Sequence, residues 1–296
     1  MSHFEPRITR RTMLSHSARA AAFAATLGQI EPLLAGSKSR WFKIGACEFC
    51  LGKPNPANFE IAKQIGLDGL QVDLGRPNPD EHLIKPEVQK AYLAAAKKTG
   101  LEIASLSIGV MNTIPLKSDP RAAKWLAESV GVCKALGITV SMPAMFGRGD
   151  LDMNNTREID HVVKVVKAVA PSAEKAGVII GLENYLSAKD NMTIIDRIGS
   201  PAVKVYYDVG NSTDKGYDIL KEIRELGRRG LICEFHAKDG RFMLGQGRID
   251  FRQVRKALDD IQFNGWFQIE AARPNGVVPD YRADYRYLRT VFPERG

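Results

Sequence analysis

Cysteine is scarce in this sequence of 296 residues, and four cysteines cannot build a disulfide framework for a chain of this length. Cys47 and Cys50 have the Cys-x-x-Cys spacing of half a zinc site, but no second pair follows to complete one. If both lie on one strand, positions i and i+3 face opposite sides, so the pair would chelate poorly. We therefore interpret Cys47, Cys50, Cys133 and Cys233 as small core residues.

Long apolar runs and concentrated basic charge are also missing. No apolar run approaches the roughly 18 to 20 residues that a membrane-spanning helix needs, so we expect no stable membrane anchor. The net charge is +8, but residues 1–40 contribute +4 of it, which leaves +4 for the other 256 residues. Because nucleic-acid binding requires a concentrated basic face, we expect no nucleic-acid partner.

The first forty residues are typical of a targeting segment. Thr9–Leu14 (Thr-Arg-Arg-Thr-Met-Leu) resembles the twin-arginine export motif, and the small-residue apolar run Ala18–Leu27 follows it. Such a segment is a targeting signal and takes no part in the fold. We predict a twin-arginine-like leader over residues 1–40 and an exported, periplasmic protein. The alternatives are a disordered basic tail and a cytoplasmic location.

From residue 41 onward, short β-like runs alternate with amphipathic helical patterns. The strand-like runs span residues 41–50, 67–74, 101–110, 138–146, 178–185, 203–209, 231–238 and 266–271. The helical patterns span residues 56–65, 85–98, 121–136, 158–176, 191–198, 217–229, 251–261 and 279–291. Four glycines stand between a helical pattern and the next strand, where a helix C-cap is expected: Gly100, Gly137, Gly177 and Gly230.

Eight strand–helix pairs favour an α/β fold with one (β/α)8 TIM barrel over residues 41–296, since about 250 residues are typical of that barrel. The alternative is an open doubly wound sheet. No Gly-x-Gly-x-x-Gly motif follows the first strand, so the fingerprint of a dinucleotide-binding fold is missing.

Ionisable residues stand at the predicted ends of four successive strands. These residues are Glu183, Asp208, His236 and Glu270, at separations of 25, 28 and 34 residues, each about one strand–helix unit. Because active groups of a TIM barrel lie at the C-terminal ends of the strands, the four would share one rim. Three carboxylates at close quarters repel one another unless a cation lies among them. With one imidazole, the set suits a single divalent ion, Mn²⁺, Mg²⁺, Co²⁺ or Zn²⁺.

The pattern resembles that of a known family. The four residues, together with His-x-Lys-Asp at 236–239 and Gly-x-Gly-x-x-Asp-Phe at 245–251, are similar to those of the sugar phosphate isomerase/epimerase group of xylose isomerase-like TIM barrels. The resemblance covers essentially the whole chain after residue 40. It implies that Glu183, Asp208, His236 and Glu270 hold the metal, and that Glu183 and Glu270 also act as acid and base on a small-molecule sugar.

The implied chemistry is proton transfer beside a carbonyl group. A metal chelated by a ketone oxygen and the neighbouring hydroxyl stabilises the enediolate that forms when the intervening C–H loses its proton. Return of the proton to the opposite face gives epimerisation, and return to the adjacent carbon gives isomerisation. Loss of a β-hydroxyl gives dehydration, so a keto-sugar lyase or dehydratase is the alternative function.

Two further functions are weighed against this prediction. A DNA-repair endonuclease on the same barrel needs a histidine-rich site for several zinc ions. Only His82, His161 and His236 follow residue 40, and we interpret the first two as surface residues, so that site cannot be built. A non-catalytic sugar-binding barrel would have no need of two glutamates facing a metal.

The chain also departs from the pattern of ketose 3-epimerases. Those enzymes usually have a histidine where this chain has Asn211, and an arginine where it has Phe242, one place after Arg241. The residues that we expect to contact the substrate are Lys238, Asn211, Arg241, Arg273, Glu48 and Asp73. Barrels of this kind commonly form homo-oligomers, although the sequence itself shows no interface.

Overall fold

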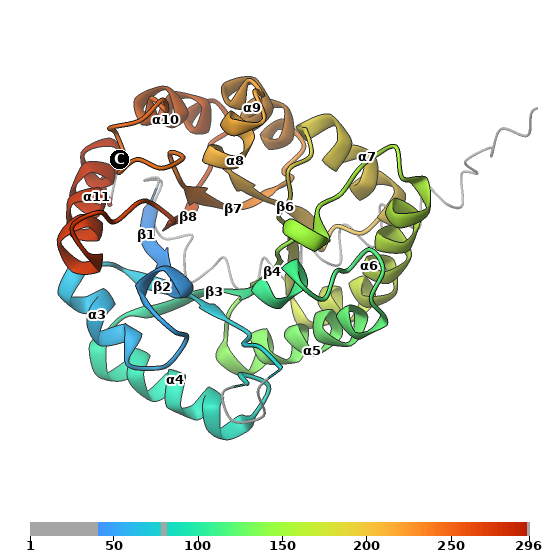
Figure 1. The fold of residues 1–296 in the computed structure, drawn as a ribbon, viewed down its shortest axis with the longest axis horizontal. Coiled ribbons are helices and arrows are strands. Elements are labelled where there is room, and N and C mark those ends of the chain that lie inside the picture. The colour runs from blue at the N-terminus through green and yellow to red at the C-terminus, as the bar shows by residue number, and fades with distance from the viewer. Residues whose placement is uncertain (1–40, 78–81, 295–296) are drawn as a thin grey trace, which may run out of the picture.

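Eight parallel strands close into a barrel in the computed structural model, which describes residues 41–77 and 82–294 (Figure 1). The strands are β1 (Phe42–Cys47), β2 (Gly69–Asp73), β3 (Glu102–Ile108), β4 (Val140–Pro143), β5 (Ile179–Leu182), β6 (Val203–Asp208), β7 (Ile232–Ala237) and β8 (Gly265–Ile269). Each strand pairs with the next, and β8 pairs with β1. The prediction of a TIM barrel is confirmed. The predicted leader lies outside the described residues, so export remains a prediction.

Long helices form a ring outside the strands, and the short helices α2 (Glu48–Leu51) and α8 (Val209–Asp214) lie inside this ring, near the strand ends (Figure 1). The long helices are α3 (Asn58–Ile65), α4 (Pro86–Thr99), α5 (Pro120–Leu136), α6 (Thr156–Ala176), α7 (Ala188–Ile198), α9 (Ile219–Arg228), α10 (Phe251–Asp260) and α11 (Val277–Val291). Short 3-10 helices follow β3 and β4, at Gly109–Asn112 and Gly147–Gly149. Within the described ranges, no helix has both the length and the apolar character needed to cross a membrane.

Helix α6 illustrates how the local sequence sets the ends of these helices. The side chain of Asn155 accepts a hydrogen bond from the backbone N–H of Glu158 and so caps the first turn. Valines at helical spacing, such as Val162 and Val166, are buried against the barrel. Gly177 then ends the helix with a φ of 69°, a left-handed conformation that costs glycine little.

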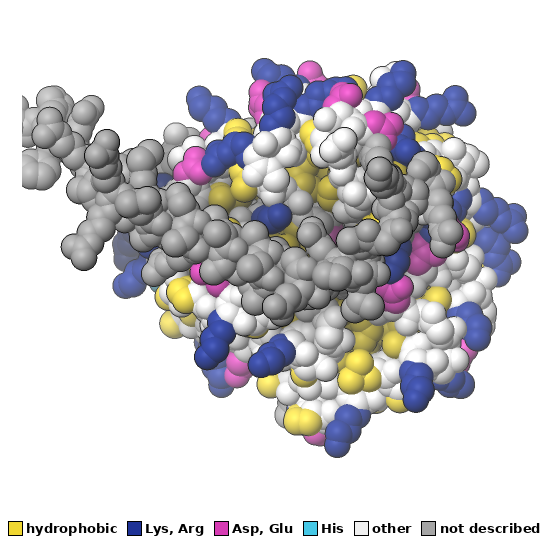
Figure 2. All heavy atoms as spheres, turned by 180° about the vertical axis from the view of Figure 1, so that it is seen from behind, with side chains coloured by type: hydrophobic (Ala, Val, Ile, Leu, Met, Phe, Trp, Pro, Cys, Tyr) yellow, Lys and Arg dark blue, Asp and Glu magenta, His cyan; other side chains and the backbone are white. Residues whose placement is uncertain are grey.

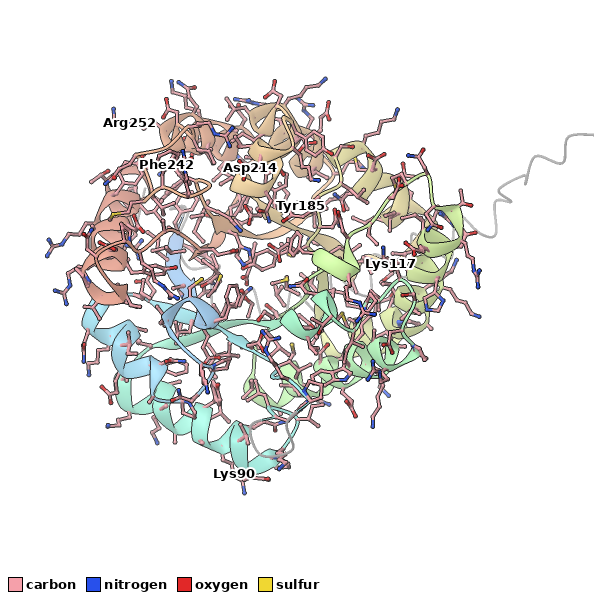
Figure 3. All side chains as sticks on the ribbon, in the orientation of Figure 1. Lys90, Lys117, Tyr185, Asp214, Phe242 and Arg252 are labelled. Carbon is pink, nitrogen blue, oxygen red and sulfur yellow. The ribbon has the colours of Figure 1, made fainter. Side chains whose placement is uncertain are left out.

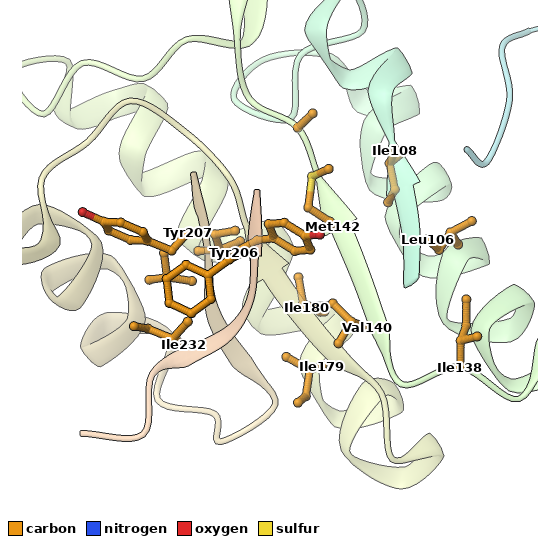
Figure 4. Close-up of a cluster of buried hydrophobic side chains, with 14 of the residues drawn as sticks. Leu106, Ile108, Ile138, Val140, Met142, Ile179, Ile180, Tyr206, Tyr207 and Ile232 are labelled. Atoms are coloured by element: carbon orange, nitrogen blue, oxygen red, sulfur yellow. The ribbon is translucent and has the colours of Figure 1, made fainter. Parts of the chain in front are cut away.

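Apolar packing and one polar layer together fill the barrel wall and interior. Side chains such as Leu106, Val140 and Ile180 form a continuous buried cluster (Figure 4). Deeper inside, the hydroxyl of Ser105 on β3 donates a 2.8 Å hydrogen bond to Glu234 on β7. Burial raises the pKa of Glu234 to about 8. Glu234 therefore belongs to the interior packing below the rim.

Two local predictions about the secondary structure were wrong. The predicted strand 41–50 ends at Cys47, where the chain turns into the short helix α2, so Cys47 and Cys50 do not lie on one strand. After β6, the carboxylate of Asp208 accepts a hydrogen bond from the N–H of Asn211 and starts the unpredicted helix α8. The sequence of α8, Val-Gly-Asn-Ser-Thr-Asp, contains weak helix formers, which explains why no helical pattern was visible.

Charge on the barrel exterior is mixed. On the part of the face visible in Figure 2, Lys and Arg side chains are spread around the edge with Asp and Glu among them. The described residues of that face therefore present no single concentrated basic patch.

The close approach of β1 to β2 depends on Gly45. A Cβ added there would lie 2.8 Å from the carbonyl oxygen of Gly69, a backbone atom that cannot move aside easily. Gly45→Ala is therefore expected to lower the free energy of unfolding by about 1–3 kcal/mol, measured by urea denaturation. Gly131→Ala, in α5, is the control, because open space surrounds its added Cβ. Equal stability of the two variants would contradict the prediction.

Candidate active site and metal centre

The four predicted ligands meet at the C-terminal end of the barrel. Glu183 and Glu270 directly follow β5 and β8, Asp208 ends β6, and His236 lies in β7. Nδ1 of His236 lies 2.7 Å from Oε1 of Glu183, 3.3 Å from Oε2 of Glu270 and 3.8 Å from Oδ2 of Asp208. One ligand atom from each residue can be chosen so that all four lie within 4.8 Å of one another.

The donor set fits a divalent cation. Glu183, Asp208 and His236 are each at most 3% exposed, so their charges face one another with little solvent between them. Oδ1 of Asp208 accepts the cap hydrogen bond from Asn211, whereas Oδ2 is buried and has no hydrogen-bond partner among the described residues. A buried carboxylate oxygen without a partner is costly, and a bound cation would satisfy it.

The orientation of His236 is fixed by Gln71, a residue that the sequence analysis did not identify. Nε2 of His236 lies 3.1 Å from Oε1 of Gln71. The amide nitrogen of Gln71 donates to Ser105, so its oxygen is the atom that faces the imidazole. Nε2 therefore carries a proton and donates to Gln71, which leaves Nδ1 free as a ligand. The available signal was a lone polar residue inside the apolar strand β2.

Lys238 adds a positive charge to the cluster. Its Nζ lies 2.6 Å from Oε1 of Glu270 and 3.9 Å from Oδ2 of Asp208. Burial alone would lower the pKa of Lys238, but Asp208 and Glu270 outweigh burial and raise it, so the ammonium stays charged. Gly210 makes room for this side chain, because a Cβ there would lie 2.7 Å from Cγ of Lys238.

The cluster of Glu183, Asp208, His236 and Glu270 shifts the pKa values of two of its members. Burial, and then the neighbouring Glu270, raise the pKa of Asp208 to about 7. Burial would lower the pKa of His236, yet Glu183, Glu270 and Asp208 together raise it to about 9. In the metal-free protein at neutral pH, His236 is therefore protonated and shares its proton with the carboxylates around it.

Metal binding is expected to release protons and to strengthen as pH rises. A metal ion needs the unprotonated nitrogen of His236, whose pKa is about 9, and the ionised carboxylate of Asp208, whose pKa is about 7. The metal affinity should therefore increase from pH 6 to pH 9. For each proton that binding releases, the affinity rises about tenfold with each pH unit. Calorimetric titrations of the metal-free protein in buffers of different ionisation enthalpy measure the number of protons. Affinity independent of pH would contradict the assignment.

A cavity of about 500 Å³ opens above the cluster. Of the residues expected to contact substrate, four line this cavity: Asp73, Asn211, Lys238 and Arg273. The structure does not bring Arg241 there, because its guanidinium lies 5.6 Å from the ring centroid of the exposed Phe242. Glu48 is also absent from the lining.

Glu48 is fully buried and holds two loops together. Its carboxylate accepts hydrogen bonds from the N–H of Asp73 at 3.0 Å, the N–H of Asn55 at 3.0 Å and the hydroxyl of Tyr92 at 2.8 Å. Burial raises its pKa to about 7 despite these bonds. Glu48 therefore fixes the loop after β1 against the end of β2, where Asp73 enters the cavity.

Several cavity residues were missed by the sequence analysis because they lie in loops or in short helical turns without a regular pattern. They include Phe49, Lys53, Arg76, Asn112, Phe146 and Tyr185. The rings of Phe146 and Tyr185 lie 4.6 Å apart and form an aromatic wall. Figure 3 shows Tyr185 on the inner side of the helix ring, whereas Lys90 and Arg252 lie on the outer surface.

The fold and the cluster define a TIM barrel with a carboxylate–histidine centre at its mouth. The chain belongs to the xylose isomerase-like TIM barrel family, which matches residues 59–291. It is 25% identical over 223 residues to the 2-epi-5-epi-valiolone 7-phosphate 2-epimerase of Actinoplanes sp., covering 73% of this chain and 82% of that protein.

Solved structures share the fold at lower sequence identity. The 3-keto-D-glucoside 4-epimerase of E. coli is 18% identical with a TM-score of 0.69, and the match covers 84% of this chain and 99% of that one. The D-psicose 3-epimerase of Clostridium cellulolyticum H10, solved with D-tagatose, is 21% identical with a TM-score of 0.69, over 84% and 99% of the two chains.

Proposed function

We propose that the chain is a divalent-metal-dependent epimerase or isomerase of keto-sugars. The observation that carries the proposal is the convergence of Glu183, Asp208, His236 and Glu270 within 4.8 Å beneath a cavity of about 500 Å³. The sugar epimerases among the relatives and structural neighbours support the reaction class. The volume of the cavity suits a substrate of monosaccharide size.

The four residues would hold one divalent ion, which supplies Lewis-acid stabilisation of the negative charge that develops on the substrate oxygens. Glu183 follows β5 and Glu270 follows β8, with β6 and β7 between them, and in the proposed mechanism the two carboxylates act on opposite faces of the substrate. One takes the proton from the carbon next to the carbonyl, and the other delivers a proton to the opposite face. Lys238 lies beside Glu270, and its ammonium donates a hydrogen bond that orients that carboxylate.

The alternatives share this first proton transfer and differ in the step after it. Return of the proton to the neighbouring carbon isomerises the sugar, and loss of a β-hydroxyl dehydrates it. A non-catalytic sugar-binding barrel would perform no proton transfer at all.

Exchange in D₂O tests the common step. Purified protein loaded with Mn²⁺ should incorporate deuterium at the carbon next to the carbonyl of a keto-sugar, detected by NMR. The product then distinguishes epimerisation from isomerisation and dehydration. Absence of exchange across a broad panel of neutral and acidic keto-sugars would overturn the proposed function.

Positive charge at one side of the cavity favours a substrate with an acidic group. Lys53, Arg76 and Arg273 line the cavity from the loops after β1, β2 and β8, which are neighbours in the barrel. No carboxylate among the described residues lies within 4.0 Å of these three cationic groups, although Arg76 interacts electrostatically with Asp73 in the same cavity. A phosphate or carboxylate on the substrate would pair with them while the sugar carbons lie over the carboxylate cluster.

Arg273→Leu is expected to raise KM for an acidic keto-sugar by about 10- to 100-fold, because a charge-assisted hydrogen bond contributes about 1.5–3 kcal/mol. The value of kcat and the KM for a neutral keto-sugar should change little. Arg241→Leu is the matched control, since that arginine lies outside the cavity. Steady-state kinetics with phosphorylated, uronic-acid and neutral sugars measure the effect. An equal rise in KM for acidic and neutral substrates would contradict the proposal that the substrate carries an acidic group.

A further inference from the structure

Cys47 and Cys50 lie next to each other where β1 passes into α2. Cys47 ends β1 and precedes α2, and Cys50 lies in the single turn of α2. Residues three apart on a helical turn are neighbours, and the thiol of each cysteine is a side-chain hydrogen-bond partner of the other. A disulfide needs Cα atoms about 4.4–6.8 Å apart, a separation that one helical turn provides.

The pair borders the proposed metal centre. The sulfur of Cys47 lies within 4.8 Å of ligand atoms of both His236 and Glu270, so it could take part in a sulfur-containing ligand set. The thiol of Cys50 also contacts the hydroxyl of Tyr281, which lies 3.3 Å from the backbone nitrogen of Ala271, next to Glu270. A change in either thiol therefore acts directly on the surroundings of Glu270.

The two thiols differ in solvent exposure. Cys47 is fully buried, whereas Cys50 is partly exposed and directly follows Phe49, a residue that lines the cavity. The other two cysteines make different contacts, since Cys133 bonds to the carbonyl of Val140 and Cys233 to that of Val205. They serve as internal controls.

We propose that Cys47 and Cys50 form a reversible disulfide that determines whether the metal centre has a sulfur ligand. The oxidant is a small-molecule disulfide. The thiolate of Cys50 attacks one of its sulfurs, forms a mixed disulfide and releases the first thiol. The thiolate of Cys47 then attacks the sulfur of Cys50 and releases the second thiol. The two protons lost by the cysteines end on the two released thiols, so one disulfide replaces another.

The consequence concerns the choice of metal. In the reduced protein, Cys47 can join His236 and Glu270 around an ion that accepts thiolate, such as Zn²⁺ or Co²⁺. Mn²⁺ and Mg²⁺ prefer oxygen ligands and gain nothing from the sulfur. Formation of the disulfide removes that ligand and leaves the oxygen-rich set of Glu183, Asp208, His236 and Glu270.

The disulfide is tested on the full chain without metal, independently of any sugar chemistry. The protein is equilibrated in mixtures of reduced and oxidised glutathione, free thiols are alkylated, and the intact mass is measured. Wild type should lose two thiols together and regain them on reduction. Cys50→Ser should form no internal disulfide, and Cys233→Ala, which replaces another partly exposed cysteine, should behave like wild type. Persistent free thiols, or only a stable glutathione adduct, would overturn the proposal.

The sulfur ligand is tested by loading Co²⁺ and recording the near-ultraviolet spectrum. Reduced wild type should show a thiolate-to-cobalt charge-transfer band that disappears in the oxidised protein and in Cys47→Ser. Thermal unfolding confirms that each variant is folded. A reduced, folded, cobalt-loaded protein without this band would remove Cys47 from the ligand set and overturn the link between the disulfide and the metal.

Discussion

Glu270→Gln is expected to lower kcat by about 10²- to 10⁴-fold at saturating metal, the range typical of losing a general acid or base. Glutamine keeps the shape of the side chain, and its amide oxygen can still accept the 2.6 Å hydrogen bond from Lys238. What disappears is the negative charge and the ability to carry a proton. Deuterium incorporation should fall in parallel, because proton transfer is the step affected.

Two measurements separate lost chemistry from lost metal. Activity is followed across a metal titration, so that weaker binding appears as a shift of the midpoint and lost catalysis as a lower plateau. Glu87→Gln, an exposed glutamate in the first turn of α4, is the matched control and should retain full activity. A Glu270→Gln plateau above one tenth of the wild-type value would show that Glu270 carries no proton.

Asp208→Asn is expected to weaken metal binding by about 100-fold or more, which corresponds to at least about 2.7 kcal/mol. The asparagine oxygen can keep the cap hydrogen bond to the N–H of Asn211, so α8 should remain intact. The amide nitrogen would replace Oδ2, the buried oxygen without a partner, and an NH₂ group cannot act as a ligand. Isothermal titration of the metal-free protein measures the loss.

Asp208→Asn should weaken metal binding but should not lower the stability of the metal-free protein at alkaline pH. The pKa of Asp208 is raised from 3.8 to about 7, so the folded state holds the proton on this carboxyl group more tightly than the unfolded state does. The resulting contribution to the free energy of unfolding is fully present below pH 3.8 and is lost as the pH rises through 7. Asparagine has no such titration, and the metal-free variant should therefore be at least as stable as wild type at pH 8. Chemical denaturation at pH 5 and pH 8 tests this. If metal-free stability fell instead, Asp208 would have a structural role that outweighs charge repulsion.

The parts of the fold that follow a repeating pattern could be predicted from the sequence. All eight predicted strands overlap those of the barrel, because each is a short apolar run bounded by helical periodicity. The placement of Glu183, Asp208, His236 and Glu270 followed from the same regularity. Strands of a TIM barrel deliver their C-terminal ends to one rim, so four positions along the chain determined one place in space.

The remaining site residues depend on loops, where the sequence has no period to follow. Arg241 and Glu48 both follow strand ends. The guanidinium of Arg241 lies over the exposed ring of Phe242, whereas Glu48 is buried and accepts hydrogen bonds from the backbone. The placement of Cys47 and Cys50 on one strand was wrong for a related reason: the strand ends three residues earlier than its apolar run suggests. A contact between distant segments, such as that of Gln71 with His236, produces almost no recognisable pattern in the sequence around either residue.

The four converging carboxylate and imidazole groups come from β5 to β8, whereas Lys53 and Arg76 come from the loops after β1 and β2. Two of the three basic residues proposed to choose the substrate are thus encoded far from the proposed metal ligands, and Arg273 after β8 is the third. Insertions, deletions or exchanges in the loops after β1 and β2 can alter which sugar is accepted without displacing a single ligand. Directed evolution toward a new sugar can therefore begin in these two loops, which carry none of the four proposed ligands.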